Sequence, residues 1–213
     1  MILNYSPNML KTYKLCPRKY YFKYIERVNV PILNTPFEKG KKIHALANYY
    51  LQNIDISKIE AALTPEEKQT WRALQNNDYF KMKCIETEYQ LSSKLGVFWL
   101  GGRMDALMQD GNSYYILDYK TGSVPDNPKY DYQTMIYLTN LDKSLESYET
   151  INFVYIDLKR NKDLLITYNA ELKAEYQDKI TDICKKISSD KAYSPNHQSC
   201  KNCEYSHLCS KSL

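Results

Sequence analysis

The stretch that decides the fold runs from residue 101 to residue 122 and reads GGRMDALMQDGNSYYILDYKTG. Its centre, Asp110-Gly111-Asn112, separates two runs of apolar and β-forming residues, 97–109 and 113–120. An Asp-Gly pair between such runs is a strong signal for a β-hairpin, because both residue types tolerate the backbone conformation of a tight turn. We therefore expect two antiparallel strands joined at this turn.

Three charged side chains are expected to converge on one face of the hairpin. Side chains alternate along a strand, so Asp118 and Lys120 point to the same face and Tyr119 to the other. Pairing across the hairpin would bring Asp105 near Asp118. Two carboxylates beside a lysine suit a hard cation such as Mg²⁺, which polarises a phosphoryl oxygen and lowers the pKa of a bound water. The alternative is an exposed strand face with paired charges, because an Asp-x-Lys triplet often arises by chance.

The rest of the chain predicts an α/β fold in which helices flank a mixed β-sheet, because a run of strands is preceded and followed by helical patterns. With 213 residues the chain fits one domain. We expect a helical N-terminal region (1–83), a core (84–188) and a cysteine-rich tail (189–213). Helices are expected over 8–27 with a break at Cys16-Pro17, 37–52, 64–83, 129–141 and 170–188, and further strands over 84–91, 150–158 and 163–168.

The composition is that of an ordinary globular protein, with 43% hydrophobic and 25% charged residues. A net charge of +4 excludes a wholly basic, histone-like protein but allows a local basic groove. No run approaches the roughly 20 apolar residues of a membrane span, and residues 1–15 lack the apolar segment of a signal peptide. We therefore expect a cytoplasmic protein without a membrane partner. The 21 tyrosines could stack on bases or fill half-buried positions.

The hairpin motif resembles the RecB-like branch of the PD-(D/E)XK nuclease superfamily. Gly102-x-x-Asp105 is followed by Leu-Asp-Tyr-Lys-Thr-Gly at 117–122, the order that this branch shows. The resemblance implies a single nuclease domain with a restriction-endonuclease-like core. It also implies that Asp105, Asp118 and the backbone carbonyl of Tyr119 bind Mg²⁺ or Mn²⁺, while Lys120 helps to position the attacking water.

Other positions extend the resemblance over almost the whole chain. His44 matches a histidine that the branch carries on an upstream helix, where it would favour Mn²⁺. Gln133 and Tyr137 match a Gln-x-x-x-Tyr on the helix after the active strand, and residues four apart share a helix face. The branch also has an acid on the preceding strand, which corresponds to Glu86 or to Glu88.

The cysteines form a second constellation. Three of them make a C-x₂-C-x₅-C pattern in the tail, whereas Cys84 and Cys184 lie within a predicted strand and helix, where cysteine packs as a small apolar residue. That leaves Cys16 as a fourth ligand. Four thiolates could complete a tetrahedral zinc site or hold an iron–sulfur cluster. The candidate ligands are Cys16, Cys200, Cys203 and Cys209, with His197 and His207 as substitutes.

Members of the same nuclease branch with one N-terminal and three C-terminal cysteines bind a [4Fe–4S] cluster. They include AddB-type helicase–nuclease subunits and CRISPR-associated adaptation nucleases. The resemblance implies that such a cluster, with zinc as the alternative, joins the tail to the Cys16 region in a separate lobe. Unligated, reduced cysteines are the remaining interpretation.

The function that the resemblance implies is a divalent-metal-dependent DNA nuclease, exo- or endonucleolytic, acting on single-stranded DNA or DNA ends in recombination, repair or CRISPR adaptation. A helicase or an integrase is the expected protein partner. The alternatives are a non-catalytic DNA-binding or assembly module and a zinc-stabilised interaction protein. Phosphate contacts are expected from Arg18, Lys19, Lys23, Lys41 and Lys42.

Overall fold

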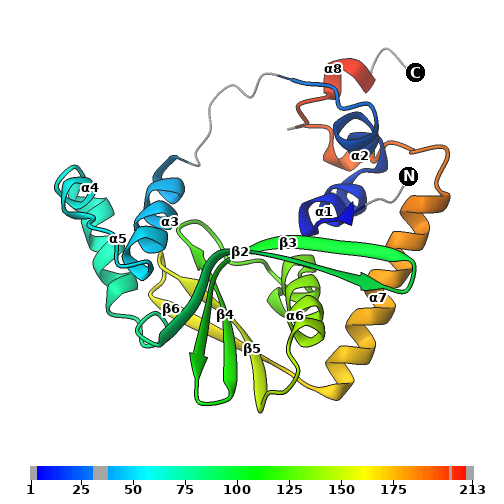
Figure 1. Cartoon of the computed structure of the whole chain (residues 1–213). Coiled ribbons are helices and arrows are strands. Elements are labelled where there is room, and N and C mark those ends of the chain that lie inside the picture. Colours follow the sequence, from blue (N-terminus) through cyan, green and yellow to red (C-terminus); the bar gives the residue numbers. More distant parts are fainter. Residues whose placement is uncertain (1–3, 31–37, 202, 210–213) are drawn as a thin grey trace.

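The computed structural model describes residues 4–30, 38–201 and 203–209, and within them six strands form one mixed sheet (Figure 1). The order along the sheet is β1-β3-β4-β5-β6, and β2 pairs with the other edge of β3. The strands are β1 (Asn4–Tyr5), β2 (Lys83–Leu95), β3 (Phe98–Asp110), β4 (Ser113–Lys120), β5 (Thr150–Asp157) and β6 (Lys162–Tyr168).

Helices account for most of the remaining described chain. The helix predicted over 37–52 begins at residue 37, which lies outside the described residues. The α-helices are α1 (Pro7–Leu15), α2 (Pro17–Tyr20), α3 (Glu38–Leu51), α4 (Ser57–Ala61), α5 (Pro65–Gln75), α6 (Tyr132–Ser144), α7 (Ala170–Ser189) and α8 (Ser206–Cys209), with a π-helix at Tyr21–Ile25 and 3-10 turns at Pro128–Tyr130 and His197–Ser199. No helix among them is both long and apolar enough to cross a membrane.

The predicted hairpin is confirmed. β3 and β4 are antiparallel and pair from Asp110–Ser113 to Ala106–Leu117, where their pairing ends. β4 then runs parallel to β5, so the sheet is mixed, as the order of elements predicted. The end of the β3–β4 pairing matters for function, because Asp105 and Asp118 are the next residues along the two strands.

Helices cover both faces of the sheet (Figure 1). On one face, α1, α6 and α7 pack on side chains such as Ile116 and Phe153. On the other, α3 and α5 pack on Leu117, Tyr119 and Val154. Neighbouring residues of β4 and β5 thus enter opposite cores, and these two strands are buried on both sides. β4, the strand that carries Asp118 and Lys120, is therefore one of the two strands that are packed on both sides.

Local capping sets several helix boundaries. α1 begins where Ser6 accepts a hydrogen bond from Met9 N–H at 3.3 Å, and it ends before Cys16-Pro17, as predicted. α5 begins with a capping box between Thr64 and Glu67, an arrangement that contributes about 1 kcal/mol. The prediction that this helix reaches residue 83 was wrong. It ends at Gln75, because Asn77 uses its side-chain oxygen to cap Tyr79 and Phe80 N–H in a turn of its own.

The C-terminal tail packs against the N-terminal helices (Figure 1). Asn196 Nδ2 donates to Leu15 O at 2.9 Å, and Tyr205 donates its hydroxyl to Val28 O at 3.2 Å. The Tyr205 ring stacks on Phe22 with a centroid separation of 5.7 Å. Residues 202 and 210–213 of the tail lie outside the described part of the chain. The two ends of the chain, distant in sequence, therefore lie together.

Candidate active site

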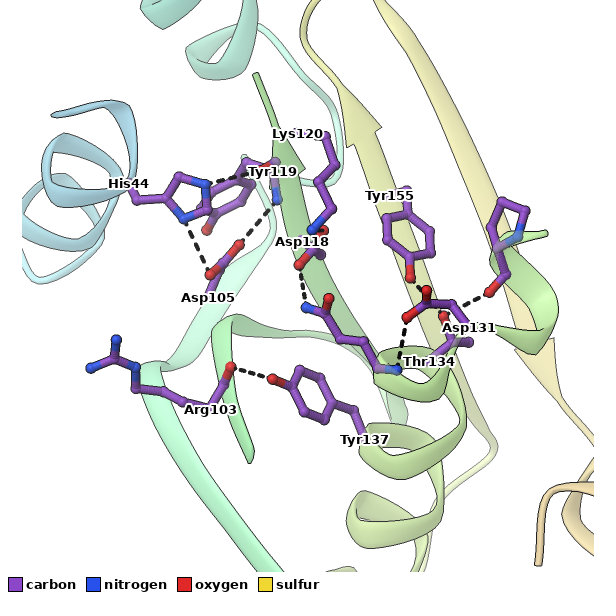
Figure 2. A network of polar contacts seen from close by, with 12 residues as sticks. His44, Arg103, Asp105, Asp118, Tyr119, Lys120, Asp131, Thr134, Tyr137 and Tyr155 are labelled. Carbon is purple, nitrogen blue, oxygen red and sulfur yellow. Dashed lines mark hydrogen bonds and ion pairs between the residues drawn. The ribbon is translucent and has the colours of Figure 1, made fainter. Parts of the chain in front are cut away.

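Asp105 lies at the point where β3 and β4 separate. Asp105 is one residue beyond the last register pair, Ala106–Leu117. Its Oδ2 accepts a hydrogen bond from Tyr119 N–H at 3.1 Å, in place of a strand-to-strand bond (Figure 2). The side chain of one strand is thereby fixed to the backbone of the other. The sequence predicted that Asp105 approaches Asp118, and in the structure Asp105 is bonded to the backbone of Tyr119, the residue that follows Asp118.

His44 connects α3 to the same point. Its Nε2 lies 2.9 Å from Tyr119 O and its Nδ1 lies 3.2 Å from Asp105 Oδ1. A ring that donates to both acceptors carries a proton on each nitrogen. Burial lowers the pKa of His44, but the hydrogen bond to Asp105 and the charges of Asp105 and Asp118 outweigh it, so the pKa lies above its usual value. His44 thus contacts both Asp105 and the Tyr119 carbonyl, the groups with which it was expected to share a cation.

Asp118 is buried, with a side-chain exposure of 4%. Gln133 Nε2 donates to its Oδ1, and Lys120 Nζ lies 2.7 Å from its Oδ2 (Figure 2). The lysine contact is an ion pair rather than an aligned hydrogen bond, so Oδ2 has no hydrogen-bond partner. Burial and the charge of Asp105 raise the pKa of Asp118, while the neighbouring cations lower it less. Burial and the second carboxylate therefore disfavour the charged form of Asp118, despite the ion pair with Lys120.

Gln133 and Tyr137 lie on one face of α6, as their spacing predicted, but they make different contacts. Gln133 reaches Asp118, whereas Tyr137 donates its hydroxyl to Arg103 O at 2.7 Å. Gly102 explains how the ring fits, because a Cβ at this position would lie 2.2 Å from a ring carbon of Tyr137. Tyr137 therefore supports the backbone of β3 two residues before Asp105, and its hydroxyl is engaged away from the carboxylates.

Of the two candidate acids on β2, Glu88 is the nearer to Asp105 in the register. It lies opposite Asp105, between the register pairs Thr87–Ala106 and Tyr89–Met104. Its carboxylate forms an ion pair with Arg103 at 2.8 Å, and its φ of 50° is in the left-handed region that non-glycine residues seldom adopt. Glu86 pairs with Leu107, beside a register shift, and is exposed. Sequence alone could not choose between the two glutamates, because the register shift in β2 decides which β2 residue lies opposite Asp105.

Two residues of the site were missed. Asp131 caps α6 by accepting from Gln133 N–H at 2.8 Å, and Lys11 of α1 lies 2.8 Å from the same oxygen. Together they fix the first turn of the helix that carries Gln133. The capping role of Asp131 could have been read from an aspartate standing just before a helical pattern. Nothing in the sequence marks Lys11 as its partner.

The four candidate cysteine ligands come from the two chain ends that pack together. Asn196 N–H donates to Cys16 Sγ at 3.3 Å. Burial raises the pKa of Cys209, and the charges of Cys16 and Cys203 raise it further. All six cysteines are free thiols. Within the described ranges, no three His, Cys, Asp or Glu side chains already stand in the arrangement of a metal site.

The remaining cysteines occupy packing positions. Cys184 is fully buried in the α7 side of the core, and burial raises its pKa to about 12. Cys84 is half-buried, and its thiol donates to Glu86 O at 3.6 Å. Neither lies in the tail or beside α2, so their placement agrees with the packing role expected from their position in a helix and a strand.

The basic residues expected to contact DNA differ in their surroundings. Lys19 forms an ion pair with Glu204 at 2.7 Å, and Lys42 forms one with Glu67 at 3.0 Å. Arg18 lies over the Tyr21 ring, 5.8 Å from its centroid. The two others, Lys23 and Lys41, are exposed.

Comparison with known proteins identifies the family. The family model of the PD-(D/E)XK nuclease superfamily matches residues 4–83 and 71–210. No curated protein matches. A solved structure from Eubacterium rectale, named "Putative exonuclease", has 10% sequence identity and a TM-score of 0.62, covering 96% of this chain and 87% of that one. Another, SSO0001, has 17% identity over 99% of this chain and 87% of that one, but its TM-score of 0.48 carries no weight.

The first structural likeness supports the fold alone, since its identity is low. The family match covers both halves of the chain, including the hairpin with Asp105, Asp118 and Lys120. These residues converge at the end of two strands beside a helix-borne glutamine, and the mixed sheet between helices is consistent with a restriction-endonuclease-like core. The chain belongs to the PD-(D/E)XK nuclease superfamily.

Proposed function

We propose that this nuclease is a divalent-metal-dependent enzyme that hydrolyses phosphodiester bonds in DNA, on single strands or at ends. The observation that carries the proposal is the state of Asp118. It is a buried carboxylate that lies beside a second one, Asp105, and the only partner of its Oδ2 among the described residues is the Lys120 ion pair. Two carboxylates whose repulsion raises a pKa form a site that a hard cation would stabilise.

The donor set fits Mg²⁺ or Mn²⁺. Asp105, Asp118 and the backbone carbonyl of Tyr119 offer oxygen ligands, and His44 offers a nitrogen that favours Mn²⁺. When bound, the cation would polarise the scissile phosphate and lower the pKa of a water. His44 would then give up a proton and its present hydrogen bonds to become a ligand.

The other side chains would act by position and charge. Lys120, held 2.7 Å from Asp118, would orient the attacking water or stabilise the charge that develops on the phosphate. Gln133 would keep Asp118 from rotating away, because it donates to the other carboxylate oxygen. Tyr137 would keep the Asp105 strand in place through the carbonyl of Arg103.

We further propose that the chain is of the RecB-like, iron–sulfur type. Cys16, Cys200, Cys203 and Cys209 would hold a [4Fe–4S] cluster, or zinc as the alternative, between the tail and the N-terminal helices. Support comes from the hydrogen bonds that Asn196 of the tail donates to Cys16 Sγ and to Leu15 O, which join the tail to the N-terminal helices. Bound metal would stabilise this lobe, because thiolate–metal bonds provide folding free energy.

Substrate contacts and partners follow from the same proposal. Arg18, Lys23 and Lys41 would meet phosphates directly, while Lys19 and Lys42 would first have to leave their carboxylate partners. A helicase or an integrase would deliver the DNA in recombination, repair or CRISPR adaptation.

Cleavage assays test the catalytic proposal. Purified protein would be incubated with end-labelled single-stranded and double-stranded DNA in Mg²⁺, in Mn²⁺ and in EDTA. We expect cleavage with either metal, none in EDTA, and a preference for single strands or ends. DNA binding without cleavage under every metal condition would instead support a non-catalytic binding module.

A further inference from the structure

Lys120 has a second neighbour besides Asp118. Its ammonium lies 5.8 Å from the centroid of the Tyr155 ring, a geometry in which the electron-rich face of the ring attracts a cation. Tyr155 is the register partner of Asp118 on the adjacent parallel strand β5, so the ring lies next to the carboxylate as well. The ring is completely buried. It therefore forms a fixed surface against which Lys120 rests.

The Tyr155 hydroxyl belongs to a short series of hydrogen bonds that ends at the Pro128 carbonyl, and this carbonyl fixes the direction of the series. Thr134 Oγ1 lies 2.8 Å from Pro128 O and 2.8 Å from the Tyr155 hydroxyl. A carbonyl can only accept, so Thr134 gives its single hydroxyl proton to Pro128. Tyr155 must then donate to Thr134. The hydrogen bonds thus all point in one direction, from Tyr155 on β5 through Thr134 in the first turn of α6 to Pro128 in the preceding 3-10 turn (Figure 2).

This series of hydrogen bonds adjoins both side chains that hold Asp118, Lys120 and Gln133. Lys120, against the Tyr155 ring, contacts Oδ2 of the carboxylate, and Gln133, the residue before Thr134, donates to Oδ1. One buried set of contacts therefore fixes a strand residue and a helix residue relative to the same carboxylate.

We propose that Tyr155 and Thr134 are positioning residues of the nuclease, which hold Lys120 and Gln133 in place around Asp118. The inference rests on the proposed function, because it assigns the two residues to that reaction. Tyr155 acts through its ring on Lys120, and Thr134 acts through its hydroxyl on Tyr155 and on the start of α6. Neither residue touches the substrate.

A second pair in the same molecule provides a matched control. Tyr168 of β6 is also buried, and its hydroxyl lies 3.5 Å from Thr139 Oγ1 of the same helix α6. Its ring packs against Tyr176 of α7, at a centroid separation of 5.8 Å. This pair ties the sheet to α6 as Tyr155 does, but its contacts lead to the core rather than to Lys120.

The test compares kcat and KM for single-stranded DNA among Tyr155→Phe, Tyr155→Leu, Thr134→Val, Tyr168→Phe and Tyr168→Leu, with melting temperatures for each. Tyr155→Leu removes the ring and the hydroxyl, and we expect kcat to fall at least about tenfold. This loss is smaller than the roughly 10²–10³-fold loss for a group that acts directly on the transition state, because Tyr155 acts through Lys120. Tyr155→Phe and Thr134→Val keep the ring and should lower kcat by about fivefold, the loss of one net hydrogen bond. KM should not change, and the Tyr168 variants should keep the wild-type kcat.

A mutant cycle shows whether Tyr155 acts through the lysine. In a Lys120→Ala background, Tyr155→Leu should cause almost no further loss of kcat. The positioning role is overturned if the losses multiply, if the Tyr168 variants lose as much activity at equal stability, or if Tyr155→Leu cleaves as fast as an active wild type. A wild-type protein that cleaves no DNA with Mg²⁺ or Mn²⁺ would overturn the proposed function, and this role with it.

Discussion

Tyr119 donates its backbone N–H to the Asp105 side chain at 3.1 Å, immediately beyond the last residue pair that joins β3 to β4. The same peptide segment offers the Tyr119 carbonyl to His44 at 2.9 Å. The separation of two strands thus exposes one backbone donor and one backbone acceptor, and the site is built around them. Asp105 consequently has a structural task in addition to its proposed catalytic one.

These two tasks of Asp105 can be separated by mutation. Asp105→Asn keeps an oxygen that can accept from Tyr119 N–H but loses the charge, whereas Asp105→Ala loses both. We expect both variants to lose cleavage. Only the alanine variant should also lose stability, by about 1 kcal/mol for one hydrogen bond. Urea unfolding and a cleavage assay measure the two effects, and an asparagine variant with full activity would contradict the proposed role of the charge.

Lys120→Ala should lower kcat by roughly 10²–10³-fold, the usual effect of removing one group that stabilises transition-state charge. The fold should change little, because the Lys120 side chain is 26% exposed. Single-turnover cleavage at saturating DNA measures the rate. Lys162→Ala, on the exposed start of β6, is the control and should keep the wild-type rate. A loss below about tenfold for Lys120→Ala would reduce this lysine to a surface charge.

Gly102→Ala should destabilise the protein by about 1–3 kcal/mol, because the added Cβ would lie 2.2 Å from the Tyr137 ring. Displacement of this ring from Arg103 O should also lower kcat. Gly122→Ala is the matched control, since a Cβ at that position would have open space for 4 Å around it. Equal unfolding free energies for the two variants, measured in urea, would show that the Tyr137 ring leaves room for a Cβ at position 102.

Much of this arrangement was predictable from sequence, and the exceptions have physical causes. The Asp-Gly turn and the alternation after it predicted the strand 113–120, which is β4 with the same bounds. Capping and proline signals predicted both ends of α1. Contacts between distant segments leave no local pattern, which is why the pairing of Lys11 with Asp131 was missed. The choice of Glu88 depended on a register shift in β2, which also has no sequence signal here.

The pH dependence of stability should reveal how α1 is tied to the end of α7. Asp190 accepts from Tyr193 N–H and from the Tyr13 hydroxyl, and these bonds, the backbone one first, lower its pKa despite partial burial. A carboxylate with a lowered pKa in the folded state stabilises it above the pKa of the unfolded chain, and this contribution is lost as the pH falls through the folded value.

Asp190→Asn should therefore unfold more easily than wild type at pH 7, and the difference should shrink below about pH 4, the ordinary range of an aspartate. Urea unfolding at both pH values measures it. Asp78→Asn is the control, because the Asp78 side chain is 97% exposed. A difference for Asp190→Asn that stays constant with pH would mean that the charge of Asp190 contributes nothing.

Changing Cys16, Cys200, Cys203 or Cys209 to Ser should remove the brown colour and broad visible absorption of anaerobically purified protein, and should lower its melting temperature, because the tail would be released from the N-terminal helices. Cys84→Ala and Cys184→Ala should keep the colour, since these thiols lie at packing positions. Bound zinc without iron would disprove the iron–sulfur cluster while leaving the four ligands in place. Wild-type protein with neither metal would contradict the ligand assignment.

The most direct measurement compares wild type with Asp118→Ala, which removes the buried carboxylate that Gln133 and Lys120 hold. Cleavage of end-labelled single-stranded DNA is followed with Mn²⁺, and binding of the same DNA is followed by fluorescence anisotropy. We predict that wild type cleaves and that Asp118→Ala binds DNA with similar affinity but does not cleave it. Cleavage by Asp118→Ala at the wild-type rate would contradict the account of the active site.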